Sequence, residues 1–119
     1  MKKKSTTRQQ LFYALAEPTR RDILELLANK GQLAASDIYE NFEVSAPAIS
    51  QHLKILREAD LVLMEKRAQQ HIYNLNPGAM TEIETWIQKM TKNWNDRFNM
   101  LDKVLQEEKK KIKSGNEKI

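Results

Sequence analysis

The segment SAPAISQHLKILRE, residues 45–58, constrains the fold of this chain more than any other. Ser45 is a good N-cap, because its hydroxyl can accept hydrogen bonds from the free N–H groups of a first helical turn. Pro47 falls in that turn, where its missing N–H is no loss. A shorter helix is expected just upstream, at 35–42, so only a few residues link the two helices. This arrangement predicts a helix-turn-helix.

After residue 60 the apolar residues change from a helical period to the period of a strand. Residues 61–67 and 71–75 flank Ala68-Gln69-Gln70, which predicts a hairpin with these three residues as its turn. A helix-turn-helix followed directly by a hairpin is the order of a winged helix. Two earlier helices are expected at 7–16 and from Pro18 to about residue 28, followed by a short extended segment at Gln32-Leu33.

A long last helix is expected from about residue 79 to 110, with Asn76 as its cap. Apolar residues recur along it at steps of three and four for more than three heptads, which is typical of a seam against a second helix. One position of the seam is filled by Arg97 or Phe98, a local flaw. The seam residues are Ile83, Ile87, Met90, Trp94, Leu101, Val104 and Leu105. The predicted fold is therefore mostly α with a small β-hairpin, a winged helix-turn-helix with a long C-terminal dimerisation helix.

The charge of the chain is concentrated at its ends. The net charge is +4, but residues 1–8 and 109–119 hold nine Lys or Arg and one Glu, so the remainder carries −4. The tails either aid solubility or touch phosphate, and the high pI is no argument for DNA binding by the folded part. We expect four parts: a basic N-terminal tail (1–8), a winged domain (9–78), the long helix (79–110) and a basic, disordered tail (111–119).

The chain has no cysteine, so disulfides, thiol catalysis and zinc–thiolate sites are absent. A cytoplasmic location is the expectation that follows. No apolar run reaches the roughly 20 residues of a membrane span. No nucleophile–base pair or carboxylate pair stands out, so we do not expect an enzyme.

The helix at 45–58 has one polar arc when its residues are placed at 100° intervals. Ser50 and Gln51 are short, uncharged and able to hydrogen-bond, which suits base edges in a DNA major groove. Lys54 and Arg57 lie where phosphates would run, and Pro47 shares this arc. An ordinary solvated face is the alternative, but the other solvent faces of this chain are dominated by Glu and Lys. The arc favours DNA reading.

His52 is bracketed by apolar residues on the same helix. It has no acidic residue or second histidine three or four positions away, which disfavours metal binding and catalysis. Two interpretations remain, a partly buried histidine bonded to backbone that braces the helix, or a contact to DNA phosphate. We favour the brace.

These residues also carry a family resemblance. EPTRRDILELL at 17–27, SAPAISQHLKILREADLV at 45–62 and the hairpin ending IYNL are similar to the ArsR/SmtB winged-helix transcriptional repressors, over about residues 10–108. The resemblance implies a homodimer built from the first and last helices, Leu11 and Leu15 included, that places two reading helices on a palindromic operator in double-stranded DNA. It also implies DNA contacts at Ser50 and Gln51, with Ser45, Pro47 and Lys54 nearby and His52 in a slot that is often histidine.

The chain departs from the metal-sensing members of that family. The segment LAASDIYENF lacks the Cys-containing box of the third helix, and the last helix has no His. WNDRFNMLDKVL at 94–105 resembles a subgroup without the metal-binding box. We therefore expect no metal site and no cofactor.

The wing departs from the family as well, because Ala68-Gln69-Gln70 replaces the usual Gly and Arg at the tip. Contacts to flanking DNA would then come from Lys66, Arg67, Gln69, Gln70 and His71, or these are exposed strand residues without a role. The predicted function is a homodimeric, sequence-specific repressor without a metal response. The alternatives are a regulator that binds an organic effector at the dimer seam and a winged-helix module that binds protein. The sequence does not identify the operator, the target genes or an effector.

Overall fold

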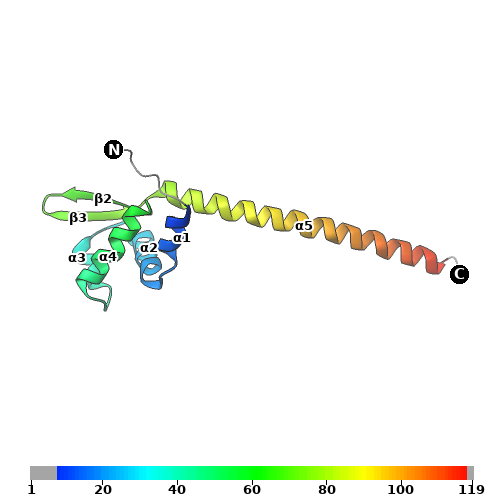
Figure 1. The fold of residues 1–119 in the computed structure, drawn as a ribbon, viewed down its shortest axis with the longest axis horizontal. Coiled ribbons are helices and arrows are strands. Elements are labelled where there is room, and N and C mark those ends of the chain that lie inside the picture. Colours follow the sequence, from blue (N-terminus) through cyan, green and yellow to red (C-terminus); the bar gives the residue numbers. More distant parts are fainter. Residues whose placement is uncertain (1–7, 118–119) are drawn as a thin grey trace. The chain divides into compact units, whose positions relative to one another are not determined.

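The computed structural model describes residues 8–117 (Figure 1). The predicted N-terminal tail, apart from Arg8, and residues 118–119 of the predicted C-terminal tail lie outside this range. The chain divides after Met80 into two compact units, here called the winged unit (8–80) and the α5 unit (81–117). The elements are α1 Arg8–Leu15, α2 Pro18–Lys30, β1 Gln32–Ala34, α3 Ala35–Glu40, α4 Ala46–Glu58, β2 Val62–Arg67, β3 Gln70–Leu75 and α5 Pro77–Glu117.

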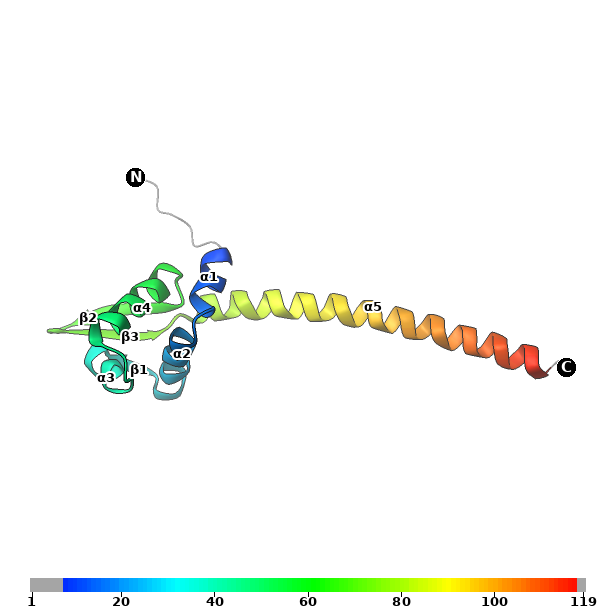
Figure 2. The same ribbon diagram turned by 60° about the horizontal axis from the view of Figure 1, so that its bottom comes forward.

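The predicted fold class is confirmed: the chain is mostly helical, with a helix-turn-helix followed by an antiparallel hairpin. β2 and β3 lie side by side in both views (Figures 1 and 2). The short segment expected at Gln32-Leu33 forms β1 and pairs with β3, so the sheet has three strands in the order β1-β3-β2. This third strand ties the turn after α2 to the base of the wing.

The helix ends follow from local hydrogen bonding. Ser45 caps α4 as predicted, since its Oγ accepts a hydrogen bond from the Ala48 N–H at 3.3 Å. Glu17 caps α2, where its carboxylate accepts from the Arg20 N–H at 3.1 Å. Gly31 ends α2 with a φ of 90°, a conformation that costs glycine little because it has no Cβ.

The core of the winged unit consists of large aliphatic side chains from all four of its helices. Three of them lie on α4, which therefore packs along its whole length against the rest of the unit. The polar side of α4 is thus presented by a rigid scaffold. The largest fully buried side chains are Leu11, Ile23, Leu27, Ile38, Ile49, Leu53, Leu56 and Leu61.

The turn of the wing is shorter than predicted. Arg67 pairs with Gln70, so the turn contains two residues, Ala68 and Gln69, and Gln70 belongs to β3. Two-residue hairpin turns favour positive φ, and Ala68 adopts a φ of 56° without the glycine that usually occupies such a position. The twist of the paired strands therefore imposes this conformation on an alanine.

The last helix is longer than predicted. Asn76 caps it as expected, since its Oδ1 accepts from the Gly78 N–H at 3.1 Å. The helix begins at Pro77 and continues to Glu117, so residues 111–117 are helical and the expected disordered tail does not start at 111. Within the described residues, no helix is both long and apolar enough to cross a membrane.

Candidate nucleic-acid interface

One face of α4 is free to meet a ligand. Its polar arc, with Pro47, Ser50, Gln51 and Lys54, is exposed as the helical spacing predicted. On the opposite side Ile49, Leu53 and Leu56 are at most 1% exposed. Burial of those three side chains fixes the rotation of the helix, so that the short polar residues point outward. Ser45 is exposed at the start of α4 while its hydroxyl serves as the cap.

Arg57 lies further along the exposed side of α4 and has a partner within the chain. Its positive charge lies close enough to the Tyr73 hydroxyl on β3 to act on it electrostatically. Burial raises the pKa of the Tyr73 hydroxyl above its ordinary value, although the Arg57 charge acts in the opposite direction. Arg57 of α4 thus interacts electrostatically with Tyr73 of β3, which the sequence did not indicate.

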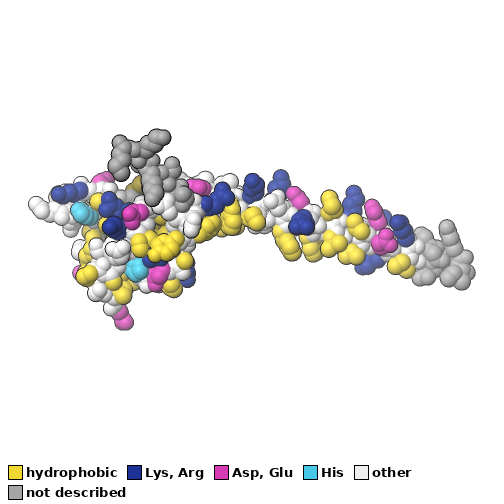
Figure 3. Space-filling view, in the orientation of Figure 1, with side chains coloured by type: hydrophobic (Ala, Val, Ile, Leu, Met, Phe, Trp, Pro, Cys, Tyr) yellow, Lys and Arg dark blue, Asp and Glu magenta, His cyan; other side chains and the backbone are white. Residues whose placement is uncertain are grey.

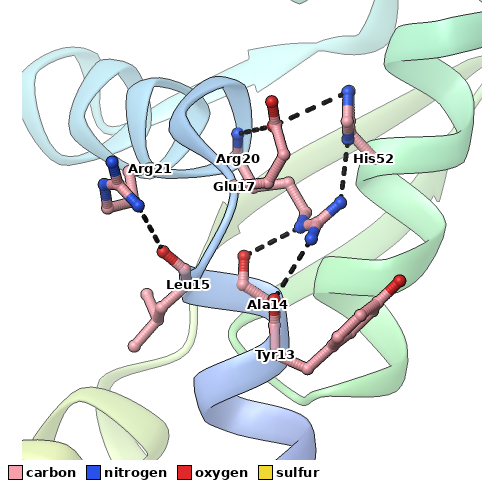
Figure 4. Close-up of polar contacts among 7 residues, drawn as sticks. All are labelled: Tyr13, Ala14, Leu15, Glu17, Arg20, Arg21 and His52. Atoms are coloured by element: carbon pink, nitrogen blue, oxygen red, sulfur yellow. Dashed lines mark hydrogen bonds and ion pairs between the residues drawn. The ribbon is translucent and has the colours of Figure 1, made fainter.

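His52 has partners on both ring nitrogens (Figure 4). Its Nδ1 lies 3.2 Å from Arg20 Nη1, and its Nε2 lies 3.8 Å from Glu17 Oε2. Because a guanidinium can only donate, Nδ1 is the acceptor, and the proton of the neutral ring is on Nε2, toward Glu17. The side chain is 19% exposed. This arrangement agrees with the predicted brace, but the partners are side chains of α2 and its cap instead of the backbone we expected.

Arg20 supports α4 in a way that the sequence did not indicate. It is only 6% exposed, yet it joins three helices. Its Nε donates to the Ala14 carbonyl at 2.8 Å, its Nη2 donates to the Tyr13 carbonyl at 3.1 Å, and its guanidinium lies 5.2 Å from the centre of the Tyr13 ring. These carbonyls end α1, where the helix dipole favours a cation. Arg20 thus fixes the end of α1 to His52 of α4.

Glu17 completes this cluster, which we call the α4 brace (Glu17, Arg20 and His52). Partial burial acts to raise the pKa of Glu17, but the backbone N–H of Arg20 and the nearby His52 outweigh it, so the pKa lies below its ordinary value of 4.5. The carboxylate is therefore ionised at neutral pH, and it faces the N-terminus of α2. The sequence did contain a signal for this cluster. Glu17 directly precedes Pro18, as the cap of a helix would, and Arg20 lies three positions after Glu17. An arginine in this first helical turn can fold back onto α1.

The predicted wing residues fall on two faces of the hairpin. Lys66 lies opposite His71, and Arg67 lies opposite Gln70, so the two pairs point to opposite sides of the sheet. Arg67 is held within the wing, since its Nη2 and Nε lie 2.6 Å and 2.9 Å from Glu65 Oε1. A surface pair of this kind contributes little stability, so a phosphate can replace Glu65 as its partner.

A hollow of about 340 Å³ lies between the wing and the start of α3. Gln69, Gln70 and His71 line it on the side of the wing. Every predicted wing residue is exposed in the folded chain. The wing therefore offers polar and basic side chains on both of its faces and at its tip.

The predicted dimerisation residues differ in exposure. Leu11 is 2% exposed and belongs to the core of the winged unit, so it can add almost no area to an interface. Leu15 is half-buried, as is Ile83. Figure 3 shows apolar side chains gathered along one side of α5. Those that are about half exposed or more are Ile87, Met90, Trp94, Phe98, Leu101, Val104 and Leu105.

No group of three or more His, Asp or Glu residues that could hold a metal ion occurs in the part of the chain that the structure describes. The histidines of the chain, His52 and His71, lie in the winged unit, one in the α4 brace and the other on the wing. The absence of a metal response stays a prediction.

Comparison with known proteins supports a regulatory role for the winged unit. Residues 17–63 match the family model described as "Bacterial regulatory protein, arsR family". The chain is 39% identical over 77 residues to the transcriptional repressor SdpR of Bacillus subtilis, an alignment that covers 65% of this chain and 84% of the relative. It is 42% identical over 66 residues to an arsenical resistance operon repressor of Staphylococcus xylosus, with 56% and 62% covered.

Solved structures give the same result for the fold. A possible transcriptional regulator for arsenical resistance is 33% identical, with a TM-score of 0.62 over 71% of this chain and 85% of the other. HlyU from Vibrio cholerae is 32% identical, with a TM-score of 0.57 over 74% and 96%. An ArsR-like regulator from Rhodococcus sp. RHA1 has a TM-score of 0.70 over 81% and 90%, and at 24% identity it supports the fold alone.

Proposed function

The chain belongs to the ArsR family of bacterial transcriptional repressors, and on that premise we propose that it acts as a homodimer that reads a palindromic operator with α4. A two-fold dimer presents two such helices to successive major grooves, about 34 Å apart along the DNA. Binding there blocks access to a promoter. The observation that carries the proposal is the exposed polar arc of α4 on a fully buried apolar base.

Within this arc the residues have different roles. Ser50 and Gln51 reach base edges, because a glutamine amide can both donate to and accept from adenine. Lys54 and Arg57 contact phosphates, which sets the position of the helix on the duplex. Ser45 and Pro47 shape the first turn of α4 at the edge of the groove. His52 acts through the brace and has no direct contact with DNA.

The wing supplies the flanking contacts in this proposal. Lys66 and His71 on one face, Arg67 and Gln70 on the other, and Gln69 at the tip meet the sugar–phosphate backbone beside the major groove. The Glu65–Arg67 pair would open on binding, and the wing adds affinity more than sequence discrimination.

The apolar stripe of α5 provides the dimer contact, together with Leu15 of α1. Exposed stripes of this size on a helix mark an interaction site. We infer that the repressor does not respond to metal, since the chain has no cysteine and its described residues form no ligand cluster.

The experiment that tests this function compares Gln51→Ala with Gln106→Ala, a glutamine on the exposed surface of α5 away from the stripe. Binding is measured to the DNA upstream of the chain's own gene and to random duplex DNA at the same salt. Gln51→Ala should weaken operator binding by about 1–3 kcal/mol and leave random DNA unchanged. Gln106→Ala should change neither. Equal losses on both DNAs would show that Gln51 does not read bases.

A further inference from the structure

The exposed arc of α4 changes in chemistry along its length. Pro47 lies one helical turn before Gln51 on the same line of the helix surface, and Ser50 and Lys54 lie beside that line. The exposed side chains therefore change from apolar at Pro47, to uncharged polar at Ser50 and Gln51, to basic at Lys54. The first turn of α4 thus contributes hydrocarbon to this face, and the charge follows later.

Three exposed apolar side chains gather at the start of the helix. Val44, directly before the Ser45 cap, is 43% exposed. Ala46 and Pro47 are the first two residues of α4 and are exposed as well. Because they are close neighbours in the chain, the three side chains form one small apolar surface, which we call the α4 tip (Val44, Ala46 and Pro47).

The backbone of the same turn is poorly suited to bind phosphate. The N–H groups of a first helical turn have no partner within the helix and commonly bind an anion. Here Pro47 has no N–H, and the Ala48 N–H donates to Ser45 Oγ at 3.3 Å. Glu43, exposed one residue before Val44, adds a negative charge that repels phosphate. Apolar contact is therefore the chemistry that the α4 tip can offer to DNA.

The major groove contains an apolar group that matches this surface. Base edges there present hydrogen-bond donors and acceptors, and thymine in addition presents its C5-methyl group. In a helix-turn-helix the N-terminal residues of the second helix contact base edges, which is where the α4 tip lies. We propose that the α4 tip packs against a thymine methyl, so that each operator half-site carries a thymine at this position. This inference rests on the proposed function and deepens it by naming a base that α4 selects.

The α4 tip and Gln51 then read neighbouring bases. The four residues from Pro47 to Gln51 span about 6 Å along the helix axis. Bases of one DNA strand are stacked about 3.4 Å apart, so this span covers no more than about two base steps. The thymine is therefore expected within about two base pairs of the base that Gln51 contacts.

Uracil is the probe that tests this contact, because it keeps the hydrogen-bonding groups of thymine and lacks only the methyl. The duplex that the full chain binds most tightly is selected from random-sequence DNA, and each of its thymines is replaced singly by uracil. At one thymine of each half-site, this replacement should weaken binding about fourfold, as expected for the loss of one buried methyl group. Thymines that the α4 tip does not contact should tolerate uracil.

Variants of the α4 tip then assign the methyl contact to these residues. Val44→Ala combined with Pro47→Ala removes exposed hydrocarbon outside the core, and alanine is compatible with the first turn of a helix. In this double variant the uracil penalty should fall from about fourfold to below about twofold. Lys54→Ala is the matched control on the same helix: it should weaken binding to the thymine and uracil duplexes equally, so their ratio stays unchanged.

The possible failures are distinguishable. A preferred sequence in which no uracil weakens binding would overturn the methyl contact and leave base reading by Gln51 in place. A penalty that is undiminished in the double variant would show that another part of the chain contacts the methyl, which also overturns the inference. If selection yields no preferred sequence, the proposed function itself fails, and this inference fails with it.

Discussion

In the winged unit, Ile23, Ile49 and Leu56 are fully covered, and the residues proposed to meet DNA are among the exposed polar ones. Along the α5 unit, Trp94 and Leu101 are 68% and 57% exposed. The winged unit thus has its own core, and its stability is expected to be independent of protein concentration. In the proposed dimer, the exposed apolar residues of α5 are covered by a second copy, so their pairing is expected to depend on protein concentration.

This difference in burial suggests separate roles for the winged unit and the α5 unit. The buried side of α4 and the brace hold its exposed face in one conformation, which would lower the entropy cost of the proposed DNA binding. In the proposed function, the apolar stripe of α5 brings two copies of α4 to the same DNA site. A change in one region should therefore be measurable without a change in the other, and three substitutions test this separation, in order of decreasing effect.

Leu53→Ala should have the largest effect and be confined to the winged unit. Leu53 is 1% exposed on α4, and truncation of a fully buried leucine costs about 2–5 kcal/mol through lost burial and the cavity left behind. Urea unfolding should show this loss equally at low and high protein concentration. A loss below about 1 kcal/mol, or one that disappears at high concentration, would mean that α4 does not pack in the chain's own core.

Leu101→Glu should act on pairing alone. A charge placed in the centre of the stripe should raise the dimer Kd by at least about 100-fold, or roughly 3 kcal/mol. The winged unit should unfold as in the parent protein, while operator affinity falls because two linked reading helices become independent. Asn99→Glu is the matched control, since it adds the same charge on the exposed side of α5 away from the stripe. A dimer that survives Leu101→Glu would contradict the stripe as the interface.

Glu17→Gln should have the smallest effect on stability, and this effect should appear only at acidic pH. The lowered pKa of Glu17 means that its ionised form stabilises the winged unit above the ordinary value of 4.5, and that this contribution is lost as the pH falls through the folded-state pKa. The variant keeps the acceptor oxygen but cannot titrate, so its stability should fall less than that of the parent protein between pH 5 and pH 3. Glu25→Gln, an exposed glutamate on the same helix, is the control. Parallel curves for Glu17→Gln and the parent would show that the brace carboxylate does not contribute.

Much of the fold could be predicted because its signals are local. The cap at Ser45 and the cap at Asn76 each depend on residues within three positions, and both are present. The wing turn was predicted one residue too long, since only the pairing of Arg67 with Gln70 decides where the strand resumes. Leu11 was predicted to contribute to the dimer interface, but it is buried in the core of the winged unit. The sequence could not decide this, because an apolar residue on a short helix can face either the chain's own core or a partner.

By itself, the sequence determined the order of helices and strands, the polar arc of α4 and the apolar stripe of α5. Each of these is a periodic pattern or a capping residue, and such features act within a few turns of the chain. Only the tertiary structure decided that Arg20 is buried against the end of α1 and bonded to His52. The contact with His52 joins residues 32 positions apart in the chain. Burial, which no local pattern specifies, determines whether a charged side chain braces the fold or faces the solvent.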